Sequence, residues 1–265
     1  MPLSPQAEQE LRQMLGAFRA AHGGAVVPTA QGKALEAWVL MRLAYSIDQL
    51  CPEWLVSLRR GDGSPLPPGQ PFQLPSGPSA IAANNPAAPG FIYFEHSRYP
   101  ERRFELRASA QWKGRSGARH EIDISMLPAS ISEALRQHGG GYPRGLPVVA
   151  IECKDKYGYG KLDETRETLA RMYDLVLVTQ PLPAWSCRIY ETKSGQRWGR
   201  KKSRYISFFQ KGTFAIVRAG SFQQGAGSLA AHYSIQHRPN IYTDPGAMAA
   251  LEAHFRHTLW SIATF

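Results

Sequence analysis

The chain has 265 residues, of which 43% are hydrophobic and 20% charged, so it can build one elaborated domain with a sizeable core. Its formal net charge of +10 favours a polyanionic partner, and nucleic acid leads because Lys and Arg release counterions when they neutralise phosphates. We find no apolar run near the ~20 residues that span a bilayer, no basic amphipathic helix and no lipidation signal, which argues against a membrane partner.

The cysteines and the N-terminus bear on the cellular compartment. Cys51, Cys153 and Cys187 are odd in number, far apart and without CxxC spacing, so neither a disulfide framework nor a zinc site is indicated. The first residues lack the charged and apolar regions of a secretion signal. We therefore expect a cytoplasmic protein.

Two helices are predicted at the start of the chain. Residues 1–28 hold an amphipathic helix capped by Ser4, and a second helix follows Thr29. Glu36 lies on the apolar face of this second helix. A carboxylate there loses hydration unless it pairs with a cation, snorkels at the edge of the core or binds a metal, and the pattern alone leaves these alternatives open.

Residues 61–90 contain eight Pro and five Gly, a composition that disfavours regular structure. A helix that needs a partner precedes this segment, and strand-like sequence follows it. We interpret the segment as a long-loop insertion within one domain, whose core spans residues 29–182.

Three β-prone stretches follow, at residues 90–97, 102–114 and 118–127, and the last two are joined by a short glycine-containing turn. These two stretches predict an antiparallel hairpin. Period-two alternation in the last stretch predicts that one face carries Glu121, Asp123 and Ser125, and that the buried face carries Ile122, Ile124 and Met126.

The stretch VVAIECK, residues 148–154, predicts a buried strand whose inner end carries Glu152 and Lys154 on one face. A connection with a short helix near residues 130–138 precedes it. The amphipathic pattern of residues 161–173 predicts a helix, and the β-branched run at 174–180 predicts a parallel strand reached by a right-handed crossover.

Residues 183–265 read as a basic C-terminal α+β extension packed on the core. Strand-like pieces occur at 213–219 and 231–237, and a final helix begins with Asp244 as its cap and Pro245 in its first turn. The predicted core therefore has the order α, β, β, β, α, β within an α/β fold.

The pair Glu152 and Lys154 gains its meaning from context, because Glu-x-Lys is common and also occurs at Glu191 and Lys193. The second copy follows no apolar strand and precedes no helix. The first copy ends an apolar strand, precedes an amphipathic helix and follows a hairpin that carries Asp123. An ordinary ion pair between strand neighbours is the alternative for this first copy.

The order of elements and residues resembles the PD-(D/E)xK nuclease superfamily, with its restriction-endonuclease-like fold, over roughly residues 29–180. The family's aspartate matches Asp123 in HEIDISML, and its acid and base match Glu152 and Lys154 in IECK. Its helix glutamate matches Glu36 in GKALEAW.

Two features depart from that family pattern. Ile122 stands where the family's namesake proline would be. Asp123 and Glu152 are 29 residues apart, so the segment between them must loop away from the sheet.

The resemblance implies a Mg²⁺ site, at which Mn²⁺ would substitute, built from Asp123, Glu152, the backbone carbonyl of Cys153 and Glu36. Hard oxygen donors on neighbouring strands suit these ions better than zinc. Lys154 would orient or deprotonate the attacking water, or neutralise the charge that builds on phosphorus. Glu36 would hold a metal-bound water or a second ion.

Histidines are secondary candidates. His254 and His257 lie three residues apart on the last helix and could ligate a metal, although packed or solvated histidines are commoner. His120, beside the hairpin acids, could approach the active site.

Two basic patches are predicted to grip nucleic acid, since cations track phosphates and aromatic rings stack on bases. One comprises Arg197, Trp198, Arg200, Lys201, Lys202 and Arg204; the other, at the hairpin turn, comprises Lys113, Arg115 and Arg119. A solvated loop is the alternative for the first patch.

The function that the resemblance implies is a metal-dependent nuclease, foremost a DNA endonuclease that leaves a 5′-phosphate and serves restriction, repair or anti-phage defence. Its partners would be DNA before RNA, and a second copy of the chain or a defence or repair protein. The alternatives are a non-catalytic nucleic-acid-binding or assembly module on the same fold, and an RNA-processing nuclease.

Overall fold

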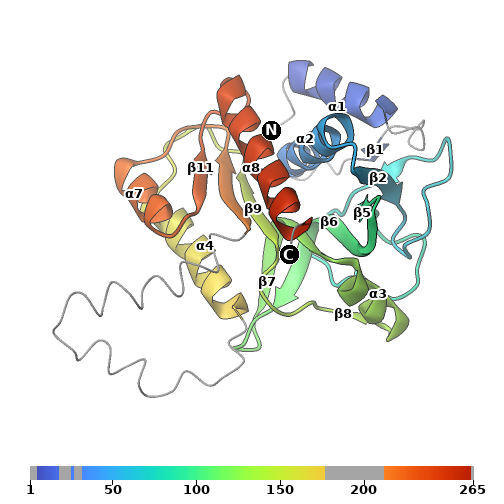
Figure 1. The fold of residues 1–265 in the computed structure, drawn as a ribbon. Coiled ribbons are helices and arrows are strands. Elements are labelled where there is room, and N and C mark those ends of the chain that lie inside the picture. The colour runs from blue at the N-terminus through green and yellow to red at the C-terminus, as the bar shows by residue number, and fades with distance from the viewer. Residues whose placement is uncertain (1–4, 18–24, 27–31, 177–211, 264–265) are drawn as a thin grey trace.

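A computed structural model describes residues 5–17, 25–26, 32–176 and 212–263 of the chain. These residues build an α/β fold around a mixed seven-stranded sheet with the strand order β11-β10-β9-β7-β6-β5-β2 (Figure 1). Neighbouring strands from β2 to β9 are antiparallel, whereas β9, β10 and β11 run parallel. The strands are β2 (Trp54–Arg59), β5 (Phe91–His96), β6 (Tyr99–Lys113), β7 (Arg119–Pro128), β9 (Val149–Lys154), β10 (Thr213–Arg218) and β11 (Gln236–Arg238).

Helices cover both faces of this sheet. Helices α2 and α8 pack on one face, with α1 against α2, while α3, α4 and α7 pack on the other (Figure 1). In the described ranges, no helix has the length and apolarity that a membrane crossing needs. The helices are α1 (Pro5–Ala17), α2 (Lys33–Leu50), α3 (Ala129–Gln137), α4 (Leu162–Leu175), α7 (Gln224–His232) and α8 (Pro245–Ala263).

The prediction of an α/β fold with a mixed central sheet between helices is confirmed. The hairpin of β6 and β7, the short helix α3 and the final helix α8 also form as predicted. At the start of α8, Asp244 Oδ1 accepts the Gly246 N–H at 2.9 Å, which satisfies one of the helix's free donors.

The strand predicted at residues 174–180 is wrong where the structure describes it. Helix α4 continues to Leu175, because Met172 and Leu175 both pack on the sheet at helical spacing. Residues 177–180 lie outside the described residues. The parallel neighbour of β9 is instead β10, paired over its whole length from Thr213 opposite Val149 to Arg218 opposite Lys154.

The central sheet therefore reaches into the predicted C-terminal extension. All six residues of β10 are buried, as expected for a parallel strand covered on both faces. The strand-like piece at 231–237 is largely helix α7 and a turn, and only β11 at its end joins the sheet. Residues 213–238 thus complete the sheet instead of packing on it from outside.

Two connections leave the sheet and return to it. The Pro/Gly-rich segment 61–90 joins β2 to its neighbour β5 and carries the short strands β3 (Phe72–Gln73) and β4 (Ile81–Ala82). These pair with β1 (Ala25–Val26) and β8 (Gly140–Gly141).

The other connection runs between β7 and β9 and forms helix α3. Arg136 of α3 donates to both carboxylate oxygens of Glu105 on β6, at 2.7 and 3.1 Å. This segment accounts for most of the residues between Asp123 and Glu152, and it loops away from the sheet as the sequence required.

Candidate active site

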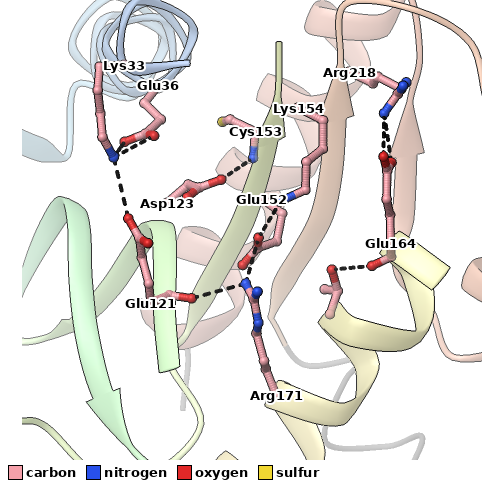
Figure 2. Close-up of polar contacts among 11 residues, drawn as sticks. Lys33, Glu36, Glu121, Asp123, Glu152, Cys153, Lys154, Glu164, Arg171 and Arg218 are labelled. Carbon is pink, nitrogen blue, oxygen red and sulfur yellow. Dashed lines mark hydrogen bonds and ion pairs between the residues drawn. The ribbon is translucent and has the colours of Figure 1, made fainter. Parts of the chain in front are cut away.

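The site begins where strands β7 and β9 part. Their ladder covers three residue pairs, from Met126 opposite Val149 to Ile124 opposite Ile151. Beyond this ladder, a side chain replaces the backbone as hydrogen-bond acceptor: Asp123 Oδ2 accepts the Cys153 N–H at 2.7 Å. Asp123 is thereby fixed beside Glu152, Cys153 and Lys154, although these residues are far apart in the chain (Figure 2).

A backbone irregularity explains why the strands part here. Ser109, opposite Asp123 on β6, has φ 47°, in the left-handed region that disfavours residues with a side chain. The pleat changes sides at this point: Ile124 packs against the α2 face, whereas Ile122 packs against the α4 face. The prediction that these two isoleucines share one face is therefore wrong, because regular alternation stops at Ser109.

The same irregularity separates the three polar residues predicted to share a face. Glu121 points toward α2, and its carboxylate lies 3.4 Å from Lys33 Nζ. Ser125 lies on the α4 face, where its Oγ accepts the Trp112 indole N–H at 3.0 Å. Asp123 lies between these two residues, at the position where β7 changes the face to which its side chains point.

Glu152 and Lys154 point to the α4 side of β9 and form an ion pair at 3.0 Å. Arg171 of α4 donates to the same Glu152 oxygen at 3.0 Å and to the Glu121 carbonyl at 3.4 Å (Figure 2). The Glu152 side chain is only 5% exposed, whereas that of Lys154 is 23% exposed. Lys154 therefore pairs with a buried carboxylate while part of its own side chain is in contact with solvent.

Glu36 is buried at the first turn of α2, and it pairs with a cation, one of the alternatives that its position left open. Lys33 Nζ lies 2.8 and 2.9 Å from its two oxygens, and Ser109 Oγ donates to Oε2 at 2.8 Å. Lys33 also donates to Ser109 Oγ. This network ties helix α2 to the strand irregularity at Ser109, opposite Asp123.

Three carboxylates, those of Glu36, Asp123 and Glu152, lie close enough to affect one another's ionisation. Burial, together with the carboxylates of Glu152 and Glu36, raises the pKa of Asp123 to about 7. Burial lowers the pKa of Lys154, but Glu152 and Asp123 outweigh that effect and raise it above the ordinary value. Lys154 is therefore a cation at neutral pH, whereas Asp123 carries only part of its negative charge.

The donor set suits a hard divalent cation in its chemistry. Asp123 and Glu152 supply carboxylate oxygens, and no described residue hydrogen-bonds Asp123 Oδ1. Burial raises the pKa of the Cys153 thiol, so this residue would contribute only its backbone carbonyl. In this structure Lys154 and Arg171 occupy the Glu152 carboxylate that would bind the ion. Within the described ranges, no three Asp, Glu, His or Cys side chains form a group able to hold a metal.

Of the two predicted nucleic-acid patches, the structure describes only the one at the hairpin turn. Residues 197–204, with Arg197, Trp198, Arg200, Lys201, Lys202 and Arg204, fall outside the described residues. At the β6–β7 turn, Arg115 donates to the Tyr173 carbonyl at 2.9 Å, and the Arg119 guanidinium lies 4.4 Å from the Tyr142 ring. Lys113, at the end of β6, is partly exposed.

The histidine candidates have other partners. His120 Nε2 lies 2.7 Å from Asp174 Oδ2, away from Asp123. His254 lies 3.3 Å from the Gly212 carbonyl, and His257 stacks on Trp260. Neither helix histidine belongs to a metal-binding group among the described residues.

Sequence analysis missed Lys33, Ser109 and Arg171. Lys33 lies three residues before Glu36, the spacing of a helical ion pair, so that one signal was present in the sequence. Ser109 and Arg171 reach the site only through the fold.

Comparison with protein-family models, with curated proteins and with solved structures finds no match for this chain.

Proposed function

We propose that the protein is a metal-dependent nuclease that hydrolyses phosphodiester bonds, foremost in DNA, on a restriction-endonuclease-like core. One observation carries the proposal: Asp123 is hydrogen-bonded to the backbone of Cys153, so it joins Glu152 and Lys154 at the parting of β7 and β9. Three residue types suited to phosphodiester hydrolysis thus meet at one partly exposed point.

In this proposal, Asp123 and Glu152 would hold Mg²⁺ with the Cys153 carbonyl, and Glu36 would support the site from α2. The bound cation would supply a water of lowered pKa and a positive charge beside the phosphate. Lys154 stays protonated, so it neutralises charge on the phosphate or orients the water and does not act as a base. Arg171 holds Glu152 in place, and Lys33 does the same for Glu36.

The test is cleavage of plasmid and of labelled single- and double-stranded DNA and RNA by the purified protein. We expect cleavage with Mg²⁺ or Mn²⁺, none with EDTA, and a loss of about a hundredfold for Lys154→Ala, because one charge on the transition state is lost. Arg12→Ala, which removes an exposed cation on α1, is the control and should cut nearly as well. Cleavage that persists in EDTA, or that is unchanged in Lys154→Ala, would contradict the proposal.

A non-catalytic nucleic-acid-binding module is the second candidate, and the ion pairs favour it. Glu152 is neutralised by Lys154 and Arg171, and Glu36 by Lys33, as in a purely structural network. The raised pKa of Asp123 argues the other way, because a structural network has no need of an additional buried acid. Nucleic-acid binding without metal-dependent cleavage of the plasmid or of any labelled DNA or RNA would support this module.

A further inference from the structure

The loop that leaves β9 directly after Lys154 presents two tyrosines to solvent. Tyr157 is 58% exposed and Tyr159 is 71% exposed, and no other large hydrophobic residue in the described part of the chain is as exposed as Tyr159. Tyr157 is three residues from Lys154, a span of at most about 10 Å. Two large rings therefore stand in water at the edge of the candidate active site.

This loop is anchored through its even-numbered residues. The segment that follows β10 binds the backbone of this loop at three points, while the side chains of Tyr157 and Tyr159 stay exposed. The Lys154 carbonyl accepts the Ala219 N–H (3.1 Å), the Lys156 carbonyl accepts the Gly220 N–H (2.9 Å), and Gly160 donates to the Ser221 carbonyl (2.7 Å).

Arg218 and Gly220 make the anchoring tight. Arg218 Nε donates to the Gly158 carbonyl at 3.0 Å, while its Nη1 pairs with Glu164 at 2.7 Å. A Cβ on Gly220 would lie 2.1 Å from the Tyr157 carbonyl oxygen, so only glycine allows this approach. The rings are thus presented by a fixed backbone, which lowers the entropy lost when a ligand binds them.

The surroundings of the rings are basic. Lys156 and Lys161 are exposed on the same loop, and Lys154 is partly exposed. Asp163, the exposed acid that follows, pairs with Arg166 at 3.1 Å. Exposed aromatic rings among cations are the features with which proteins bind unpaired bases and the phosphates between them. Bases within an intact duplex offer no free face to such rings.

We propose that Tyr157 and Tyr159 form a stacking platform for unpaired bases of a single-stranded nucleic-acid segment next to the phosphate that is cut. The proposal rests on the proposed function and names its substrate class: a single strand, or a duplex with an unpaired region. Lys156 and Lys161 contact the phosphates that flank the stacked bases.

The experiment measures fluorescence anisotropy of a labelled oligothymidine of about 20 nucleotides, long enough to cover such a site, with the full-length protein in EDTA. An abasic strand of equal length and charge is the second probe. We expect Tyr157→Ala/Tyr159→Ala to weaken oligothymidine binding at least about tenfold, because stacking on each base is lost. The wild-type protein should bind the abasic strand as weakly as this variant binds oligothymidine.

Two matched variants show whether the rings themselves act. Tyr157→Phe/Tyr159→Phe keeps the rings and should bind oligothymidine like the wild type. Tyr99→Ala removes another exposed tyrosine, at the start of β6 and ten residues along that strand from Ser109, and should also bind like the wild type. Equal binding of oligothymidine by the double alanine variant and the wild type, equal wild-type binding of both probes, or no wild-type binding would overturn the platform.

The two proposals fail separately. Tyrosine-dependent binding of oligothymidine without cleavage in Mg²⁺ would refute the nuclease while supporting the stacking of unpaired bases on the two tyrosines. Cleavage that depends on Asp123, combined with binding that ignores both tyrosines, would support the nuclease and overturn the platform.

Discussion

Replacing Asp123 by Asn is expected to stabilise the protein at pH 8 while lowering metal-dependent cleavage at least about a thousandfold, because a metal ligand supplies several kcal/mol to the reaction. Asn keeps the oxygen that accepts the Cys153 N–H, so the contact between β7 and β9 survives. What disappears is the charge that burial and the neighbouring glutamates oppose.

The stability gain should depend on pH. The pKa of Asp123 is about 7 in the folded protein, above its ordinary value of 3.8. The folded protein therefore holds the proton more tightly than the unfolded chain, and the stability linked to this group is lost as the pH rises from about 4 to about 7. The gain of Asp123→Asn should be small near pH 4 and on the order of 2–4 kcal/mol at pH 8.

Urea unfolding in EDTA at pH 4.5 and pH 8 measures this effect, since a pKa shift of one unit corresponds to about 1.36 kcal/mol of free energy. Asp163→Asn, on the exposed start of α4, is the matched control and should change the free energy of unfolding little at either pH. An Asp123→Asn protein that is no more stable than the wild type at pH 8 would show that burial and the neighbouring carboxylates do not destabilise the ionised Asp123.

Replacing Glu105 by Gln is expected to lower the free energy of unfolding by about 3–5 kcal/mol without removing any residue of the active site. The Glu105 side chain is fully buried, and Arg107 and Arg136 donate four hydrogen bonds to it, at 2.6 to 3.1 Å. Burial raises the pKa of Glu105, but the two arginines outweigh it and hold the pKa below its usual value. Gln would leave two buried cations without a counter-charge.

Denaturant unfolding checks this prediction, with Glu133→Gln as the control. Glu133 lies on the same helix as Arg136, but its pair with Arg103 is 3.7 Å long and partly exposed, so its loss should cost under about 1 kcal/mol. Because Arg136 fixes α3 on β6, the Gln variant should also loosen the connection between β7 and β9. Equal small losses in both variants would contradict the account of a buried charge triad.

Regular hydrophobic patterns predicted most of the central fold. The β-prone stretches at β6 and β7, the apolar run of β9 and the helical repeats of α2, α4 and α8 each matched the element that forms. The convergence of Asp123 with Glu152 and Lys154 followed from placing them on neighbouring strands at the same end of the sheet. The structure joins them through one hydrogen bond to Cys153.

The remaining features depend on contacts that no local pattern encodes. The residues after Tyr173 were compatible with a strand, but α4 continues to Leu175, whose side chain packs on the sheet. The parallel partner β10 lies beyond residues 177–211, so no β–α–β spacing pointed to it. The left-handed Ser109 changes the face of its neighbours, and a period-two argument cannot anticipate a single irregular residue.

The central claim is that Asp123 and Glu152 hold a divalent cation, and titration calorimetry with Mn²⁺ on metal-free protein tests it most directly. The account predicts binding by the wild-type protein that is lost in both Asp123→Asn and Glu152→Gln and retained in Asp163→Asn. Wild-type protein that does not bind Mn²⁺, or binding that persists in Asp123→Asn, would contradict it.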